Sequence, residues 1–119
     1  LDAINGATVG IAAQQGDPLA LEIVTRSATL IGLGMVNLLH LFNPQILVVG
    51  GGVSNLGDLL FVPMRETIEK YCIAREYWQD LVITRPHLGE DVSLYGAGTL
   101  VLTQGGVVDV GEVVATVGE

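Results

Sequence analysis

The segment Ile46–Ser54 constrains the fold of this chain most, because four consecutive apolar residues run directly into three glycines. A continuous apolar run bounded by turn residues is typical of a strand buried on both faces of a sheet. Gly50, Gly51 and Gly52 then let the backbone turn sharply and approach another group closely, since no Cβ stands in the way. A helical pattern follows from about Leu56. This order predicts backbone amides facing an anionic or nucleotide ligand, although the same turn also serves only to pack a helix on a sheet.

The composition fits one domain or one lobe of a larger domain. Half of the 119 residues are hydrophobic and 15% are charged, which supplies enough apolar material for a core. The net charge of −8 argues against nucleic-acid binding by this chain, which would need a basic face. It favours a cytoplasmic, soluble protein. The single cysteine, Cys72, excludes an internal disulfide, and we expect it to be half-buried on a helix.

No membrane partner is expected, because no apolar stretch reaches the roughly 18 residues that span a bilayer. The N-terminus also lacks the basic and apolar segments of a signal peptide. The chain begins at Leu1 without a methionine. We therefore expect a piece of a longer protein, with catalytic residues upstream.

Two helices are predicted before the strand that begins at Ile46. The first covers Leu1 to Gly16, and its apolar side carries Ile4, Ala7, Ile11 and Ala12. Asp17 and Pro18 suit the N-cap and first position of a second helix. Its apolar residues recur every three or four positions to Phe42, where Asn43-Pro44 ends it.

Two glycines inside this second helix, Gly32 and Gly34, each cost about 1 kcal/mol relative to alanine. Something must offset that cost. The ordinary explanation is close packing on another helix or on the sheet. The alternative is room for a bound ligand.

After the glycine turn, a helix is predicted to Cys72 with Ser54 or Asn55 as its cap, and Pro63 indicates a kink or two short helices. Asp58 near its start complements the helix dipole, which favours an adenosine or ribose contact over a phosphate. Trp78 is expected to be a packing anchor on the surface.

A second strand is predicted at Leu81–Thr84. A turn follows at Leu88-Gly89-Glu90-Asp91, and then a helix capped by Ser93 that contains Gly96-Ala97-Gly98. Gln104-Gly105-Gly106 breaks the chain, and Val107–Val117 in the tail 103–119 have strand composition. The tail could form a hairpin or pair with a strand edge of another copy. Strands that alternate with helices predict an α/β fold with a mostly parallel sheet, and two strands are few for such a sheet.

The chain lacks the common catalytic and phosphate-binding motifs. It has no Gly-x-x-x-x-Gly-Lys loop, no Gly-x-Gly-x-x-Gly fingerprint, no Gly-x-Ser-x-Gly elbow and no metal-ligand spacing. We expect His40 and His87 to be structural. A general base would have to be one of four acids at predicted caps or turns, and none is favoured: Asp17, Asp58, Glu90 and Asp91. The residues thus support binding of a nucleotide or another small ligand, not catalysis.

The order of motifs resembles the C-terminal part of the ROK family, the group of repressors, open reading frames and sugar kinases. The resemblance covers Gly16 to Leu102. It rests on Gly16-Asp17-Pro18-Leu19-Ala20-Leu21, Asn37 to Pro44, Ile46 to Ser54 with Gly57-Asp58 after it, Pro63-Met64-Arg65, and Leu88 to Asp91 ahead of Gly96-Ala97-Gly98.

The resemblance implies the C-terminal lobe of an actin-like ATPase of ribonuclease-H-like architecture, with a partial, mostly parallel sheet flanked by helices. Residues 1–102 would form this lobe, and residues 103–119 would be a tail. Family kinases transfer the γ-phosphoryl group of ATP to glucose or a related hexose. By this resemblance Gly50, Gly51, Gly52, Val53 and Ser54 would line the adenosine side of the nucleotide site. The long helix and the Gly96-Ala97-Gly98 helix would cover its back.

The family's phosphate loop, catalytic Asn-Asp pair, sugar-binding segment and zinc-binding cysteine cluster are not present in this chain, so we expect no catalytic or metal-binding residue in it. ATP, Mg²⁺ and a hexose are expected for the full-length protein only. Two alternatives stay open: a lobe of a sugar-responsive transcriptional regulator of the same family, and a lobe that serves assembly. A homo-oligomer is expected.

Overall fold

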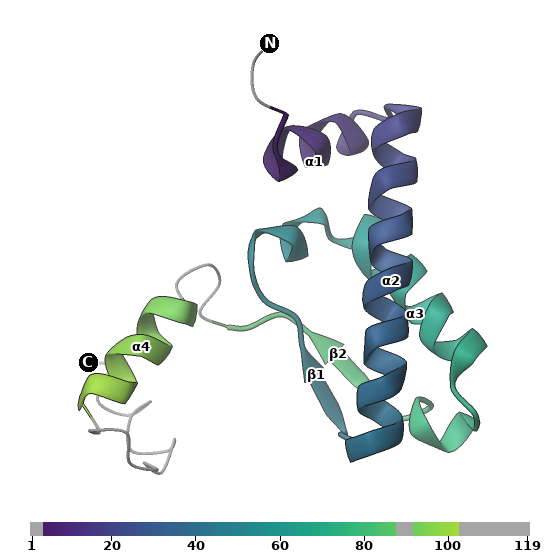
Figure 1. Cartoon of the computed structure of the whole chain (residues 1–119), viewed down its shortest axis with the longest axis vertical. Helices are drawn as coiled ribbons and strands as arrows, with labels where there is room; N and C mark the ends of the chain where they lie inside the picture. The colour runs from purple at the N-terminus through teal and green to yellow at the C-terminus, as the bar shows by residue number, and fades with distance from the viewer. Residues whose placement is uncertain (1–3, 88–91, 103–119) are drawn as a thin grey trace. The chain divides into compact units, whose positions relative to one another are not determined.

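The structure is a computed structural model that describes residues 4–87 and 92–102. The chain divides into two compact units, Leu1–His87 and Leu88–Glu119. The first unit holds α1 (Gly6–Gln14), α2 (Pro18–Phe42), β1 (Ile46–Val48), the 3₁₀ helix η1 (Gly52–Leu56), α3 (Asp58–Tyr71), the 3₁₀ helix η2 (Arg75–Tyr77) and β2 (Val82–Thr84). The second unit holds α4 (Val92–Leu102). Figure 1 labels the helices and strands.

Helix α1 begins later than the sequence predicts, because Asn5 and Thr8 form a capping box. The Asn5 side chain accepts a hydrogen bond from the Thr8 amide at 2.9 Å, and the Thr8 hydroxyl accepts one from the Asn5 amide at 3.0 Å. The predicted apolar side is wrong: Ile4 and Ile11 are 84% and 55% exposed. The helix instead buries two small residues, Gly10 and Ala13, which allow it to lie close to its neighbours.

Helix α2 has the predicted bounds. The Asp17 carboxylate accepts a hydrogen bond from the Ala20 amide at 2.8 Å, and Pro18 occupies the first position. Asn43 ends the helix in the left-handed region, with φ 44°. One face is buried, and it is formed by Ala20, Val24, Ala28, Gly32, Val36 and Leu39.

Close packing of α2 on α3 explains Gly32. A Cβ on this residue would lie 2.8 Å from both the Met64 carbonyl oxygen and the Thr67 Cβ. The two helices therefore approach each other more closely than any side chain at this position would allow. Gly34 differs, since it is exposed and a Cβ there would meet nothing within 4 Å. The packing interpretation is confirmed for Gly32 only.

Among the described residues, α2 is the one helix long and apolar enough to span a membrane by length and composition. Its best 18-residue window has a mean hydropathy of 1.5, so the prediction that no apolar stretch reaches this length is wrong. Polar residues such as Ser27 and Thr29 interrupt the apolar run in the sequence. Their hydroxyls donate hydrogen bonds to carbonyls one turn earlier, so these residues lower the apolar character of the helix only slightly. In the structure α2 packs on α1 and α3, and 33% of that window is buried.

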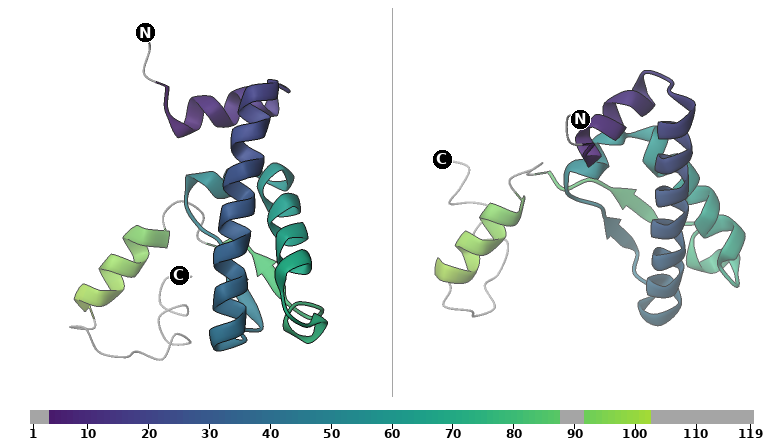
Figure 2. Two further views of the ribbon diagram at one scale, coloured as in Figure 1. Left: turned by 45° about the vertical axis from the view of Figure 1, so that its right-hand side comes forward. Right: turned by 45° about the horizontal axis from the view of Figure 1, so that its top comes forward.

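The sheet consists of β1 and β2, which run parallel in the register Ile46↔Val82 to Val48↔Thr84. The predicted parallel pairing is confirmed. The prediction that the first strand is buried on both faces is wrong. Leu47 and Ile83 pack against the helices, whereas Ile46, Val48 and Val82 are 56%, 61% and 51% exposed. Within residues 4–87 both long helices lie on the same side of the sheet, which leaves the opposite face uncovered (Figures 1 and 2).

Helix α3 joins β1 to β2 and carries much of the core. Leu60, Met64 and Ile68 are nearly fully buried. Pro63 lies inside one continuous helix, so a division into two short helices is wrong. Three apolar clusters unite the unit: Val36, Leu39, Ile68 and Leu81 near the sheet; Ala13, Ala20 and Val24 under α1; and Ala28, Leu60 and Met64 in the middle of α2.

The segment after α3 is held by local contacts. Cys72 is half-buried at the helix end, as predicted, and burial raises the pKa of its thiol. Trp78 is half-buried and packs on the cluster near the sheet, with the Arg75 guanidinium 5.9 Å from its ring. The prediction of a packing anchor is confirmed.

Helix α4 of the second unit begins at Val92, so Ser93 lies inside the helix and is not its N-cap. Its Gly96-Ala97-Gly98 segment is exposed within this unit. The predicted turn at Leu88–Asp91 and the tail 103–119 fall outside the described residues.

Candidate nucleotide-binding turn

The glycine turn lies where the carboxyl ends of both strands meet. β1 and β2 are parallel, and the pairing continues past β1 because the Val49 amide donates to the Thr84 carbonyl at 2.8 Å. Residues 50–52 follow β1 at this edge, and Arg85 follows β2. The carboxyl edge of a parallel sheet is where ligands of open α/β folds bind.

One glycine is required by the backbone of the turn. Gly51 has φ 89° and ψ 168°, a conformation that residues with a Cβ rarely adopt. Its carbonyl oxygen accepts two hydrogen bonds from Ser54, one from the amide at 3.0 Å and one from the hydroxyl at 2.7 Å. Ser54 is 5% exposed. Of the predicted site residues, Ser54 therefore holds the shape of the turn from inside.

The backbone ahead of Ser54 is open. Gly50, Gly51 and Gly52 are exposed, as is Val53 at 53%. A Cβ at Gly51 or Gly52 would meet no atom within 4 Å. The amides of residues 50–53 donate no hydrogen bond to other described main-chain groups. A run of free amides at the end of a strand can donate hydrogen bonds to a ligand.

The turn continues into α3 through a second glycine. Gly57 has φ 59° and ψ −131° and occupies the N-cap position without a capping side chain. The prediction that Ser54 or Asn55 caps this helix is wrong, because both residues belong to η1, which ends before the helix starts. Leu56 of η1 packs against Gly10 of α1, which ties the turn to the rest of the unit.

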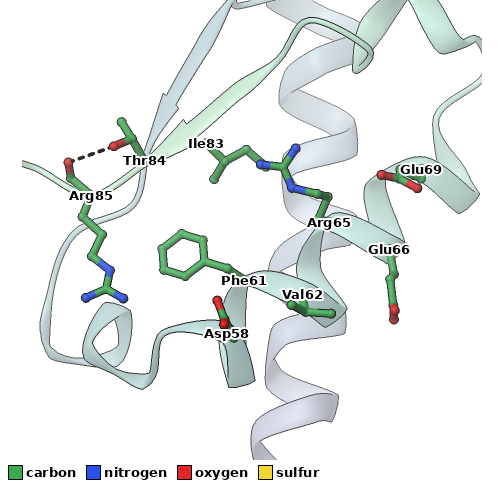
Figure 3. A pocket seen from close by; sticks show the side chains of 9 residues that line it. All are labelled: Asp58, Phe61, Val62, Arg65, Glu66, Glu69, Ile83, Thr84 and Arg85. Atoms are coloured by element: carbon green, nitrogen blue, oxygen red, sulfur yellow. Dashed lines mark hydrogen bonds between the residues drawn. The ribbon is translucent and has the colours of Figure 1, made fainter.

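A cavity of about 460 Å³ lies between α3 and the end of β2 (Figure 3). Its wall includes Asp58, Phe61, Arg65 and Arg85. The Arg85 guanidinium lies 5.5 Å from the Phe61 ring centre, and its Nη2 atom would be 3.4 Å from a Cβ on Gly57. A second cavity of about 580 Å³ runs under α1 and shares Asp58 with the first. Residues 50–54 line neither of these two cavities.

Arg85 is the residue that sequence reasoning missed. The available signal was its position directly after the second strand, at the same sheet edge as the glycines. Arg85 is exposed and places a cation beside the start of α3, where the first turn otherwise presents the carboxylate of Asp58. Its charge can therefore partly offset the repulsion between Asp58 and an anionic ligand.

The other residues weighed as catalytic have structural positions. Asp17 is occupied as the N-cap of α2. The His40 imidazole accepts a hydrogen bond from the Ile73 amide at 3.1 Å and meets the Tyr77 ring edge-on at 5.2 Å, so its structural role is confirmed. His87 is exposed in the loop after β2. Glu90 and Asp91 lie outside the described residues.

No three histidine, cysteine or carboxylate side chains cluster within residues 4–87 and 92–102 in a way that could hold a metal ion. The Mg²⁺ expected for the full-length protein thus stays a prediction.

Comparison with known proteins identifies the family. A family model described as ROK matches residues 1–104. The chain belongs to the ROK family. The match begins earlier than the resemblance drawn from motifs, which starts at Gly16, and it includes α1.

Curated ROK relatives include kinases and repressors. The chain is 36% identical to a glucokinase of Thermotoga maritima over 76% of its length and 28% of that protein. It is 32% identical to a glucokinase of Streptomyces coelicolor over 83% of its length and 31% of that protein. A protein of Caldicellulosiruptor sp. named as a putative xylose repressor is 34% identical over 55% of the chain. The chain spans about three tenths of the length of the glucokinases that it matches.

Solved structures of ROK proteins share the fold. A ROK family glucokinase from Streptomyces griseus, crystallised with glucose and AMPPNP, superimposes with a TM-score of 0.73 at 35% identity, covering 83% of this chain and 32% of that one. A ROK family transcriptional regulator described as a homologue of the E. coli MLC protein gives a TM-score of 0.67 at 25% identity over 71% of this chain.

Proposed function

We propose that this chain is the C-terminal, nucleotide-side lobe of a ROK sugar kinase that uses ATP to phosphorylate glucose or a related hexose. Residues 1–102 form the lobe of an actin-like fold, and residues 103–119 form a tail. The catalytic aspartate, the sugar site and the zinc site lie upstream. The glucokinase relatives support this proposal, since their matches cover more of the chain than the repressor match does.

The single observation that carries the proposal is the open backbone of the glycine turn. Gly50, Gly51, Gly52 and Val53 present exposed main chain at the carboxyl edge of a parallel sheet, and their amides make no described main-chain bond. The turn is held in shape by Ser54 and by η1, so it need not reorganise to receive a ligand. A nucleotide can lie against such backbone at short range because no side chain intervenes.

Gly52 is a better position than Gly51 to test this role. A valine at Gly51 would be strained by the positive φ, so lost binding could reflect a damaged turn. Gly52 has no positive φ and open space around its Cβ position, so Gly52→Val should leave the fold intact while blocking close approach.

Titration of AMPPNP into the full-length protein by calorimetry tests the proposal. Gly52→Val is expected to weaken binding at least tenfold, the effect of losing about 1.4 kcal/mol of interaction. Gly34→Val, at an exposed glycine on the far part of α2, is the matched control and should bind as the wild type does. Equal affinity for Gly52→Val and wild type would show that the turn is only structural.

A second function is favoured by a specific observation, the structural likeness to a ROK transcriptional regulator. In that case the lobe would serve sugar response, and a DNA-binding helix-turn-helix would lie upstream. No measurable nucleotide binding by the full-length protein would favour the regulator over the kinase. Under either function we propose a cytoplasmic protein, because one face of α2 is buried against the rest of the lobe.

A further inference from the structure

Arg85 links the glycine turn to the cavity that lies against α3. Its main chain follows Thr84, whose carbonyl accepts the hydrogen bond from the Val49 amide at 2.8 Å, one residue before the glycines begin. Its side chain reaches the other end of the turn, because Nη2 would lie 3.4 Å from a Cβ on Gly57, the residue between η1 and α3. Figure 3 shows the guanidinium group beside Phe61 in the wall of the cavity. A ligand of the turn that extends into the cavity would therefore meet Arg85.

The guanidinium group of Arg85 has a defined place and is not occupied by an ion pair. The Phe61 ring centre lies 5.5 Å from its central carbon, a distance at which a cation is attracted to the face of an aromatic ring. The side chain is exposed, and no carboxylate of residues 4–87 or 92–102 forms an ion pair with it. The group is therefore available to a ligand, and its plane can stack on an aromatic ring.

The lining of the cavity suits an uncharged aromatic group better than a phosphate. Phe61, Val62 and Ile83 provide apolar surface. The charged lining residues are the carboxylates Asp58, Glu66 and Glu69 and the guanidinium groups of Arg65 and Arg85. With three carboxylates against two guanidinium groups, an anion gains no net attraction from this set. The Asp58 carboxylate in the first turn of α3 repels it further. A volume of about 460 Å³ leaves ample room for a planar ring.

We propose that the guanidinium group of Arg85 is the stacking surface for the base of a nucleotide bound at the glycine turn. This role rests on the proposed nucleotide site and adds to it the residue that holds the base. The open backbone of residues 50–53 takes the sugar and phosphates, and the base lies against Arg85 at the mouth of the cavity. Stacking needs the planar guanidinium group and not the charge alone, which separates arginine from lysine at this position.

Calorimetric titration of the full-length protein with adenosine and with AMPPNP tests this role. Arg85→Ala is expected to weaken binding of both ligands about tenfold, which corresponds to about 1.4 kcal/mol, because adenosine carries the base and no phosphate. Arg85→Lys keeps the charge and loses the plane, so its affinities should fall nearly as far. Arg75→Ala is the matched control and should bind both ligands as the wild type does. Arg75 also lies by an aromatic ring, 5.9 Å from Trp78, but lines neither of the two cavities.

Three results would overturn the stacking role. Weaker AMPPNP binding with unchanged adenosine binding would assign Arg85 to a phosphate contact. Full affinity in Arg85→Lys would show that charge alone is needed. Unchanged affinity of Arg85→Ala for both ligands would remove Arg85 from the site, and if Gly52→Val still loses affinity, the proposed nucleotide site stands without it. A wild type that binds neither ligand contradicts the nucleotide site and the stacking role together.

Discussion

The contact of α2 with α3 at Gly32 gives a prediction whose size follows from the structure. In Gly32→Ala the new Cβ would lie 2.8 Å from the Met64 carbonyl oxygen and from the Thr67 Cβ, about 0.6 Å inside the 3.4 Å at which ordinary contact begins. Neither atom is the end of a flexible side chain, so α2 and α3 must separate. Insertions of this kind into a packed core cost about 1–3 kcal/mol.

Gly34→Ala isolates that cost. Both substitutions gain about 1 kcal/mol of helix propensity, but Gly34 is exposed and its Cβ position is open. The difference between the two variants is therefore the overpacking cost alone, and Gly32→Ala should be less stable than Gly34→Ala by about 1–3 kcal/mol. Urea unfolding followed by circular dichroism measures it. Equal stability of the two variants would refute the packing argument.

Three further predictions concern local contacts. Asp17→Ala should destabilise by about 1 kcal/mol in urea unfolding through loss of the α2 cap, with Asp17→Asn retaining most of the stability; a neutral Asp17→Ala would contradict the cap. His40→Ala should speed hydrogen exchange of the Ile73 amide, because that amide loses its hydrogen-bond acceptor. The Asn43 amide is the internal control, since it donates to the Leu39 carbonyl instead. Unchanged exchange at Ile73 would show that the hydrogen bond to His40 contributes nothing. Burial raises the pKa of Cys72 in the folded state, so the unfolded state ionises first and stability should fall as pH rises from the unfolded toward the folded value. Cys72→Ala should remove that fall in stability. If wild type and variant lose stability identically as the pH rises, the loss belongs to other groups.

Local signals in the sequence predicted α2 and the turn well. Asp17-Pro18 and Asn43-Pro44 act within a few residues of the helix ends, so the bounds of α2 follow from the sequence alone. The glycines after β1 likewise predict a sharp turn, and the positive φ of Gly51 confirms it.

Features that depend on distant segments could not be predicted in the same way. The exposure of Ile46 and Val48 follows from which side of the sheet α2 and α3 occupy, and a run of apolar letters does not encode that. Arg85 comes beside Gly57 only because β1 and β2 pair in one particular register. The packing role of Gly32 likewise needs Met64 and Thr67, which lie on a different helix far along the chain. Each of these requires tertiary structure.

The most direct test of the account is whether the amides of the glycine turn sense a nucleotide. In full-length protein labelled with ¹⁵N-glycine, addition of AMPPNP should shift the amide resonances of Gly50, Gly51 and Gly52 and leave those of Gly16 and Gly34 in place. Shifts confined to glycines elsewhere, with residues 50–52 unmoved at saturating nucleotide, would contradict it.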